Sequence, residues 1–332
     1  MKFEQIITDL KNQIYHPVYL LSGEEPYFID RVSGFIEENV LSESEKEFNQ
    51  TVLYGRDVDV PTIVSYAKRY PMMANYQVLI IKEAQEIKEL DALSEYAKAP
   101  LETTILVICH KYKKYDKRKS LYKTVNKKGV CFESARLYDS RVPEWINKQI
   151  RLNGFSITPK AAMMMADYLG TDLSKISNEI QKLNINLPEG TEIRDVHVEE
   201  NIGISKDYNV FELQKALGQR NILKANGIIN YFAANKKDNP LIMVVALLYS
   251  YFSKVLMFHY LTDRSQNNVA SVLSVPPFFV NDYRKAAANY STRKLQKIMS
   301  TLREYDLKSK GVGNINTEEG QLMKEMIFKI LH

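Results

Sequence analysis

The turn that follows the first apolar run lies where a phosphate-binding loop would be expected. Pro17–Ser22 reads PVYLLS, which predicts a buried strand, and Gly23 begins the turn. A loop of the form G-x-x-x-x-G-K-[ST] uses its glycines, lysine and hydroxyl to bind a triphosphate. Phe28, Ile29 and Asp30 occupy the positions of the second glycine, the lysine and the hydroxyl. The sequence therefore predicts a nucleotide-binding-like turn that binds no nucleotide.

Charged residues near this turn and after a second apolar run support the same prediction. Glu24 and Glu25 would repel a triphosphate. After the run VLII an ATPase places an acidic residue that holds magnesium, whereas here Lys82 precedes Glu83. One carboxylate beside a lysine is a poor magnesium site and is more typical of a strand end held by an ion pair. Two altered motifs in the right order indicate a fold that kept its shape and lost its nucleotide chemistry.

The other residue types that could form a catalytic or metal site are sparse. The chain has two cysteines, Cys109 and Cys131, both inside apolar runs, and five scattered histidines. No CxxC, GxSxG or HExxH motif is present. We therefore expect no catalytic residue, no metal and no cofactor. Buried reduced thiols, and an N-terminus unlike a signal peptide, predict a cytoplasmic protein.

Pro71, Met72 and Met73 form the most distinctive short feature. Apolar spacing predicts a helix over 59–70 whose buried stripe ends at Ala67, and Pro71 ends the pattern. The two methionines then lie at the tip of that helix, outside the stripe. Two readings stay open: they fill the core beneath the sheet, or they form an exposed apolar contact that enters a partner's pocket.

The run KYKKYDKRKSLYK at 111–123 predicts a basic helix. Its basic residues are Lys111, Lys113, Lys114, Lys117, Arg118, Lys119 and Lys123. Cations interleaved with tyrosines can follow a phosphate backbone and stack on bases, although a solvated helix face with half-buried tyrosines gives the same pattern. The net charge of +5 is unevenly spread, because residues 1–60 are acidic while 61–140 and 209–332 are basic. Such a distribution suits selected surfaces that meet acidic partners.

The first 140 residues alternate apolar strands with helices. Strands are expected over 17–22, 48–54, 77–81, 104–109 and 130–133. Continuously apolar strands separated by helices predict a parallel sheet covered on both faces. Beyond residue 140 no convincing strand remains, and about five helices are expected after residue 209. We therefore expect an α/β domain at 1–140, a small helical domain at 141–208 and a helical bundle at 209–332.

Two segments of the helical half allow other interpretations. Leu241–Leu261 is long enough to span a bilayer, but Lys254 and His259 interrupt it. Pro240 suits the first position of a soluble helix, so a buried bundle helix without membrane contact is expected. Asn267–Ser291 has the pattern of two helices around a Pro-Pro turn, as in a helix-turn-helix, although plain bundle packing has the same pattern.

Several segments, taken in order, resemble the bacterial DNA polymerase III delta subunits. PVYLLSGEEPYFIDR resembles the opening of that family, in which a hydrophobic strand is followed by G-E-E/D-x-Y-x-I/L. Further matching segments are YPMMANYQVLIIKEAQEI, TILVICHKYKKYDKRKSLYK, GTDLSKISNEIQKL, NVFELQKAL and a final segment that closes on YDLKSKG. The resemblance covers roughly residues 15–330 and rests on the number and order of these segments.

The resemblance implies an AAA+-like α/β domain, a small helical lid and an all-α collar that oligomerises. It also implies a clamp loader of five subunits, in which gamma/tau-type neighbours hydrolyse ATP beside a delta-prime-type subunit and primed DNA enters the assembly. In that family an apolar pair before A-x-x-Q contacts the beta sliding clamp. Met72 and Met73 precede Ala74-Asn75-Tyr76-Gln77, so the resemblance assigns the clamp contact to Pro71, Met72 and Met73.

We therefore expect a non-catalytic subunit that binds the beta sliding clamp and helps to open it. Two alternatives remain at this point: an atypical P-loop-type ATPase, and a stand-alone DNA-binding regulator that uses 267–291. Nucleotide binding would favour the first alternative, and sequence-selective DNA affinity would favour the second.

Overall fold

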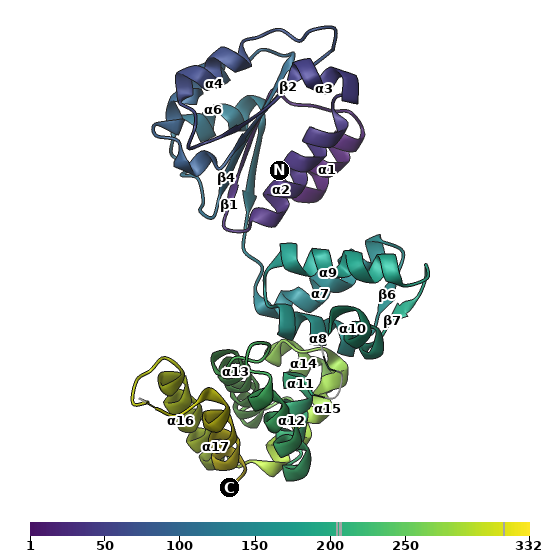
Figure 1. Cartoon of the computed structure of the whole chain (residues 1–332), viewed down its shortest axis with the longest axis vertical. Helices are drawn as coiled ribbons and strands as arrows, with labels where there is room; N and C mark the ends of the chain where they lie inside the picture. Colours follow the sequence, from purple (N-terminus) through teal and green to yellow (C-terminus); the bar gives the residue numbers. More distant parts are fainter. Residues whose placement is uncertain (204, 206–207, 315) are drawn as a thin grey trace. The chain divides into compact units, whose positions relative to one another are not determined.

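A computed structural model describes residues 1–203, 205, 208–314 and 316–332 (Figure 1). Contacts between Cα atoms divide the chain into two compact units, Met1–Leu137 and Tyr138–His332. The division lies three residues before the boundary expected at residue 140. These contacts do not divide Tyr138–His332 further, so the expected separation of a lid from a collar at residues 208 and 209 stays a prediction. The neighbouring Lys206 and Asp207 lie outside the described residues.

The N-terminal unit is built on a parallel sheet of five strands. The strands are β1 (Val18–Gly23), β2 (Gln50–Tyr54), β3 (Gln77–Lys82), β4 (Thr104–Lys111) and β5 (Val130–Ser134). Their order across the sheet is β2-β3-β4-β1-β5, and every neighbouring pair is parallel. The five strands match the expected apolar runs within two residues at each end. β1, β3 and β4 lie inside the sheet and are buried on both faces, which explains their uninterrupted apolar sequence.

Helices cover both faces of this sheet, as Figure 1 shows for α1 and α2 on one side and α4 and α6 on the other. The helices are α1 (Phe3–Lys11), α2 (Pro26–Asn39), α3 (Glu43–Asn49), α4 (Val60–Ala67), α5 (Ser94–Lys98) and α6 (Ser120–Lys128), with short 3-10 turns at Ala84–Glu86 and Leu90–Leu93. Leu21 of β1 packs on the α1 and α2 side, whereas its neighbour Leu20 packs on the α4 and α6 side.

The second unit is almost entirely helical. Its helices are α7 (Val142–Leu152), α8 (Pro159–Leu169), α9 (Leu173–Asn186), α10 (Asp195–Ile202), α11 (Val210–Gly218), α12 (Ile222–Ala234), α13 (Leu241–His259), α14 (Gln266–Leu273), α15 (Val280–Asn289), α16 (Thr292–Ser309) and α17 (Glu319–Leu331), with 3-10 turns at Asp139–Arg141 and Pro277–Phe279.

Two expectations for this unit were wrong. A parallel pair of two-residue strands, β6 (Ser156–Ile157) and β7 (Glu192–Ile193), lies where only helices were expected. Such a pair is too short to leave an apolar alternation in the sequence. Among the described residues, seven helices rather than about five follow residue 209. The break between α14 and α15 agrees with the Pro-Pro turn expected within 267–291, whereas the break between α16 and α17 was not expected.

The long apolar helix α13 forms the centre of the C-terminal bundle. Of the described helices, only α13 meets the length and composition of a membrane span. It packs against α11, α14, α15, α16 and α17. Its buried stripe includes Val244, Leu248, Phe252 and Val255, all without exposed surface. This burial accounts for its hydrophobicity as that of a core helix, in agreement with the expected bundle position.

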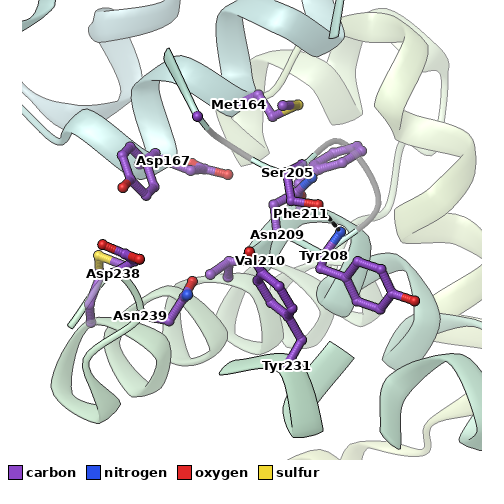
Figure 2. A pocket seen from close by; sticks show the side chains of 13 residues that line it. Met164, Asp167, Ser205, Tyr208, Asn209, Val210, Phe211, Tyr231, Asp238 and Asn239 are labelled. Atoms are coloured by element: carbon purple, nitrogen blue, oxygen red, sulfur yellow. Dashed lines mark hydrogen bonds between the residues drawn. The ribbon is translucent and has the colours of Figure 1, made fainter. Parts of the chain in front are cut away.

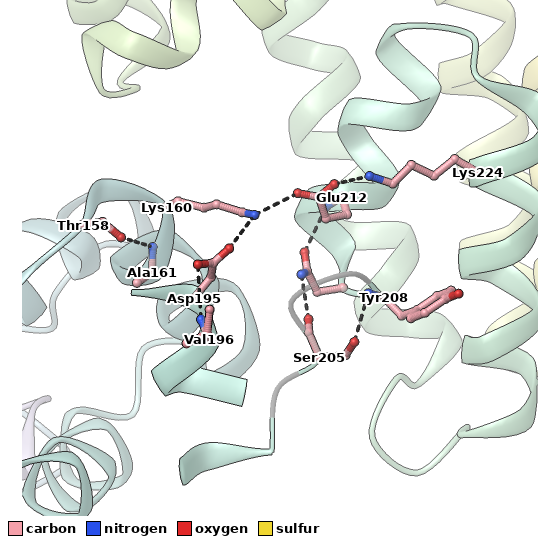
Figure 3. Close-up of polar contacts among 10 residues, drawn as sticks. Thr158, Lys160, Ala161, Asp195, Val196, Ser205, Tyr208, Glu212 and Lys224 are labelled. Atoms are coloured by element: carbon pink, nitrogen blue, oxygen red, sulfur yellow. Dashed lines mark hydrogen bonds and ion pairs between the residues drawn. The ribbon is translucent and has the colours of Figure 1, made fainter. Parts of the chain in front are cut away.

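An ion-pair network joins four helices of the second unit (Figure 3). The ammonium of Lys160 on α8 lies 2.8 Å from Asp195 on α10 and 3.3 Å from Glu212 on α11. Lys224 on α12 pairs with the other oxygen of Glu212. Glu212 is buried, and burial opposes its ionisation, but the hydrogen bond from Lys224 and the charges of both lysines outweigh this, so its pKa is lowered. One buried carboxylate therefore ties α8 to α11 and α12.

Substitution Glu212→Gln is expected to lower the free energy of unfolding of the C-terminal unit by about 2 kcal/mol at pH 7. Breaking a buried pair costs about 3–5 kcal/mol, and the lysines' partial exposure reduces that figure. The lowered pKa means that the ion pair stabilises the fold above the unfolded value near 4.5 and loses this effect as the pH falls through the folded value. Thermal melts at pH 7 and pH 4 check this. An equal difference between wild type and variant at both pH values would contradict it.

Candidate functional site

The turn after β1 is closed by the chain itself. Gly23 has φ +148°, and a Cβ added there would lie 1.9 Å from the carbonyl oxygen of Ser134 at the end of β5. The Ser134 hydroxyl donates to the carbonyl of Glu25 at 2.6 Å, and the Glu25 N–H donates to the Ser134 carbonyl at 3.3 Å. The end of β5 therefore occupies the space beside the turn, and the residues of the turn are bonded to protein.

The N-terminus of α2, where a phosphate would bind, is capped by the protein's own carboxylate. Glu25 precedes the helix and is buried, and its Oε1 accepts from the N–H of Tyr27 at 3.0 Å. Pro26 at the first helical position has no N–H to offer. A helix N-terminus attracts anions through its free N–H groups and its dipole, and Glu25 already supplies that negative charge. The expected role of Glu25 was repulsion alone, and its capping role was missed because Glu is not a preferred cap residue.

Two lysines near the expected phosphate and metal positions are held by carboxylates. Lys82, at the end of β3, lies 3.1 Å from Glu37 on α2. Burial disfavours the charge of Lys82, but the hydrogen bond and the charge of Glu37 outweigh this and raise its pKa. Lys111, at the end of β4, pairs with Asp30 at 2.5 Å. The expectation of an ion-paired strand end at Lys82 agrees with this geometry.

The described pockets are small, and the larger one lies in the second unit (Figure 2). It has a cavity volume of about 40 Å³, which is room for a few water molecules and far less than a nucleotide needs. Asp167 and Asp238 line it together with Asn209 and Asn239. Burial raises the pKa of Asp167 to about 7, although the charge of Lys254 acts in the opposite direction. A pocket with two carboxylates suits neither phosphate nor an apolar ligand.

Met72 and Met73 lie on the surface of the N-terminal unit, in the loop 68–76, which we call the methionine loop. The exposed fractions of their side chains are 63% and 102%. They were expected at the tip of a helix over 59–70, but α4 ends at Ala67, so this placement was wrong. The residue before a proline is restricted to extended conformations, which ends the helical pattern ahead of Pro71. The core-filling interpretation of the methionines is incompatible with their exposure.

Side-chain hydrogen bonds hold the end of α4 and one residue in the middle of the methionine loop. Where α4 ends, the Tyr96 hydroxyl donates to the carbonyl of Ala67, and the side chain of Gln77 donates to the carbonyl of Tyr66. In the middle, Asn49 of α3 bonds to both backbone groups of Met72. The sequence did not predict the roles of Asn49, Gln77 and Tyr96, because a hydrogen bond between a side chain and a distant backbone group leaves no local sequence pattern.

The basic residues at 111–123 lie mainly on a loop, not on the expected helix, because α6 begins only at Ser120. Lys113, Lys114, Lys117, Arg118, Lys119 and Lys123 are exposed. Lys111 is the exception, with a side chain 15% exposed. The backbone of Lys113 pairs with Gly23, so this loop runs beside the closed turn.

Ion pairs with carboxylates, and the burial of some tyrosine rings, reduce the number of side chains in this basic segment that are free to contact a nucleic acid. Lys117 and Lys114 bond to Glu133 and lower its pKa. Arg118 pairs with Asp116. In the described part of the chain, no carboxylate is paired with Lys113, Lys119 or Lys123. Of the three tyrosines, Tyr115 is buried and bonds to Asp91, Tyr122 is half-buried and Tyr112 is exposed, so one ring in three is free to stack on a base.

The helix pair at 267–291 packs into the bundle. α14 and α15 flank a 3-10 turn at Pro277–Phe279. Phe279, Val280, Tyr283 and Ala286 belong to the buried core of the unit. The pattern that resembled a helix-turn-helix is thus satisfied by core packing, which was the simpler of the two interpretations.

The fold and the closed turn together define a class of protein. A five-stranded parallel sheet in the order β2-β3-β4-β1-β5, with helices on both faces and a helical region after it, is an AAA+-like arrangement. Here the position of the phosphate loop is taken by Glu25, Ser134 and the N-terminus of α2.

Comparisons with known proteins identify the family. Residues 19–135 match the family DNA polymerase III, delta subunit, and residues 207–330 match the DNA polymerase III delta subunit, C-terminal domain. The chain belongs to the DNA polymerase III delta subunit family, as the sequence resemblance predicted.

A curated relative and a solved structure, both from Bacillus subtilis, are similar to this chain over nearly its whole length. It is 26% identical to the DNA polymerase III subunit delta of strain 168, over 91% of this chain and 90% of that protein. The solved structure of the Bacillus subtilis DNA clamp loader delta protein aligns with a TM-score of 0.57 and 24% identity, over 99% of each chain. The fold expected from the sequence is confirmed, and the chain is a clamp-loader delta subunit.

Proposed function

We propose that this subunit binds the beta sliding clamp through Met72 and Met73 and helps to hold it open. The observation that carries the proposal is a pair of fully or largely exposed methionines on a loop that is itself bonded to the protein core. Methionine side chains are apolar and adaptable, so they suit insertion into a partner's apolar pocket. The proposal is tested by passing the intact chain over immobilised clamp. We expect the chain to be retained, and a chain that is not retained at any protein concentration would refute the proposal.

Insertion of the methionines would act on the clamp by differential binding. A ligand shifts an equilibrium only as far as its affinities for the two states differ. The methionine pair therefore favours the open clamp if its pocket is more accessible there than in the closed ring. This mechanism needs no chemical step in the subunit, and ATP would be hydrolysed by the gamma/tau-type neighbours, beside a delta-prime-type subunit.

The isolated chain is expected neither to bind nor to hydrolyse Mg-ATP. Glu25 caps the helix that would receive the phosphates, and Asp30 engages Lys111. Isothermal titration with Mg-ATP at concentrations up to about 1 mM should give no binding heat. Micromolar affinity would overturn the assignment of a closed site and would favour the ATPase alternative.

Assembly with the other loader subunits is assigned to the C-terminal helices. α13 carries an exposed apolar face in addition to its buried stripe, with Ile242, Ala246 and Tyr249 at helical spacing on it and Met257 and Tyr260 further along. An exposed apolar stripe on a core helix is typical of a surface that another subunit covers.

Substituting both Ile242 and Tyr249 by Asp is expected to abolish co-purification with the loader subunits without shifting the melting temperature. Both side chains are about half exposed, so the fold tolerates charge there, whereas an apolar interface does not. Ile185→Asp, at an exposed position of α9, is the matched control. Normal assembly of the double variant would place the interface elsewhere.

DNA contact is assigned a secondary role in the assembled loader. The exposed cations of the segment 111–123 can bind primed DNA through its phosphates, without reading its sequence. Lys113, Lys119 and Lys123 are the leading candidates because no carboxylate in the described residues is paired with them. Salt-dependent binding of primed DNA by the loader, reduced when all three are replaced by alanine, is the measurement that tests this assignment.

A further inference from the structure

We propose that Asn49 is the positioning residue of the clamp contact: it holds the methionine loop in the conformation that presents Met72 and Met73. This inference rests on the proposed function of the methionine pair and adds a residue from a different element, α3. Asn49 lies 23 positions before Met72, and the residue is 2% exposed.

The Asn49 side chain satisfies both backbone groups of one loop residue. Its Oδ1 accepts from the N–H of Met72 at 2.6 Å, and its Nδ2 donates to the carbonyl of Met72 at 2.9 Å. The same Nδ2 also donates to the carbonyl of Glu45 at 3.1 Å. An amide is the side chain that offers a donor and an acceptor at one position. The bonds use only the backbone of Met72, so its side chain stays free for a partner.

α3 is capped at its start and continues directly into the sheet at its end, which makes Asn49 an anchor for the loop. Ser42 and Glu45 form a capping box at the start of the helix, with the Glu45 carboxylate accepting from the Ser42 N–H at 2.8 Å. Asn49 ends the helix, and β2 begins at the next residue. The side chain is thus held by a capped helix on one side and a strand on the other.

The loop needs this anchor because its conformation at Met73 is unfavourable. Met73 has φ +53°, in the left-handed region that a methionine rarely adopts. Without the two bonds to Met72, the neighbouring backbone would relax toward conformations in which the side chains point elsewhere. Presenting the pair in one fixed conformation lowers the ordering cost of binding, which is a gain in affinity without any new contact.

The test compares clamp binding by the full chain and by Asn49→Leu, which keeps the side-chain size and removes both bonds. The purified sliding clamp of the same organism is the probe. Clamp affinity is expected to fall at least tenfold, and amide hydrogen exchange at residues 70–74 is expected to accelerate.

Asn49→Asp keeps the acceptor for Met72 and loses the donor, so an intermediate loss of affinity is expected. This variant replaces the leucine variant in the test if the leucine variant does not fold. Val130→Ala, in the core at β5, is the control for a general loss of stability and should leave affinity unchanged.

A double-mutant cycle separates positioning from other roles. In a chain whose Met72 and Met73 are already alanine, Asn49→Leu should cause no further loss of clamp affinity. An equal loss in both backgrounds would overturn the positioning role, as would unchanged affinity and unchanged exchange in Asn49→Leu alone. If the methionine variant itself bound the clamp like wild type, the proposed contact would fail instead, so the two failures are distinguishable.

Discussion

Replacing both Met72 and Met73 by alanine is expected to weaken clamp binding by about thirtyfold or more while leaving the melting temperature unchanged. Truncation of an interface anchor typically costs about 2 kcal/mol or more, which corresponds to this factor. Substitution of exposed side chains usually changes the free energy of unfolding by less than about 0.5 kcal/mol. Both methionines are exposed. Clamp titrations and thermal melts of the double variant check the two expectations together.

Ile185→Ala is a matched control, because Ile185 is an exposed apolar residue on α9, in the other unit. It should bind the clamp like wild type. The outcome that contradicts the account is the reverse pattern for the loop variant: a much lower melting temperature with unchanged affinity in the molecules that remain folded. That pattern would make the methionines structural.

Substitution Gly23→Ala is expected to destabilise the N-terminal unit by about 4 kcal/mol, the largest stability effect expected for a single methyl group in this unit. The backbone at φ +148° costs about 1–3 kcal/mol for a residue with a Cβ, and overpacking against Ser134 adds a similar amount. Denaturant unfolding followed in the N-terminal unit measures the effect.

Gly34→Ala is the control for this substitution. Gly34 lies inside α2, and a Cβ there would meet no atom within 4 Å. Because alanine favours the helix over glycine by about 0.5–1 kcal/mol, this variant should be slightly more stable than wild type. If Gly23→Ala unfolded at the denaturant concentration of wild type, the turn would be open enough to accept a ligand, and the closed-site interpretation would be wrong.

The sheet was predictable from the sequence because its strands are buried on both faces. No surface is exposed on four consecutive residues of β3, Val78, Leu79, Ile80 and Ile81. Their uninterrupted apolar sequence therefore predicted a strand buried on both faces. Helix ends were harder to predict. α4 ends at Ala67, ahead of Pro71, and α6 begins only at Ser120 because residues before it find tertiary partners, as Tyr115 does in Asp91. Local propensity carries no information about such partners.

The sequence left the placement of the methionines open between core and surface, and it gave no indication of how the candidate site is built. Pro71, Met72 and Met73 stand out as residues outside a buried stripe, and the missing phosphate loop follows from Phe28 and Ile29 in the wrong places. The capping by Glu25 and the two bonds from Asn49 could not be predicted. Each joins a side chain to backbone geometry that exists only after folding.

Opening of the clamp by the subunit can be measured on the clamp itself. A sliding clamp carrying two fluorophores across one of its interfaces is mixed with the intact subunit in the absence of ATP. Wild type is expected to decrease energy transfer across that interface at saturating concentrations, whereas the chain with alanine at Met72 and Met73 leaves it unchanged. Saturable binding of wild type with no change in energy transfer at any interface would contradict the account.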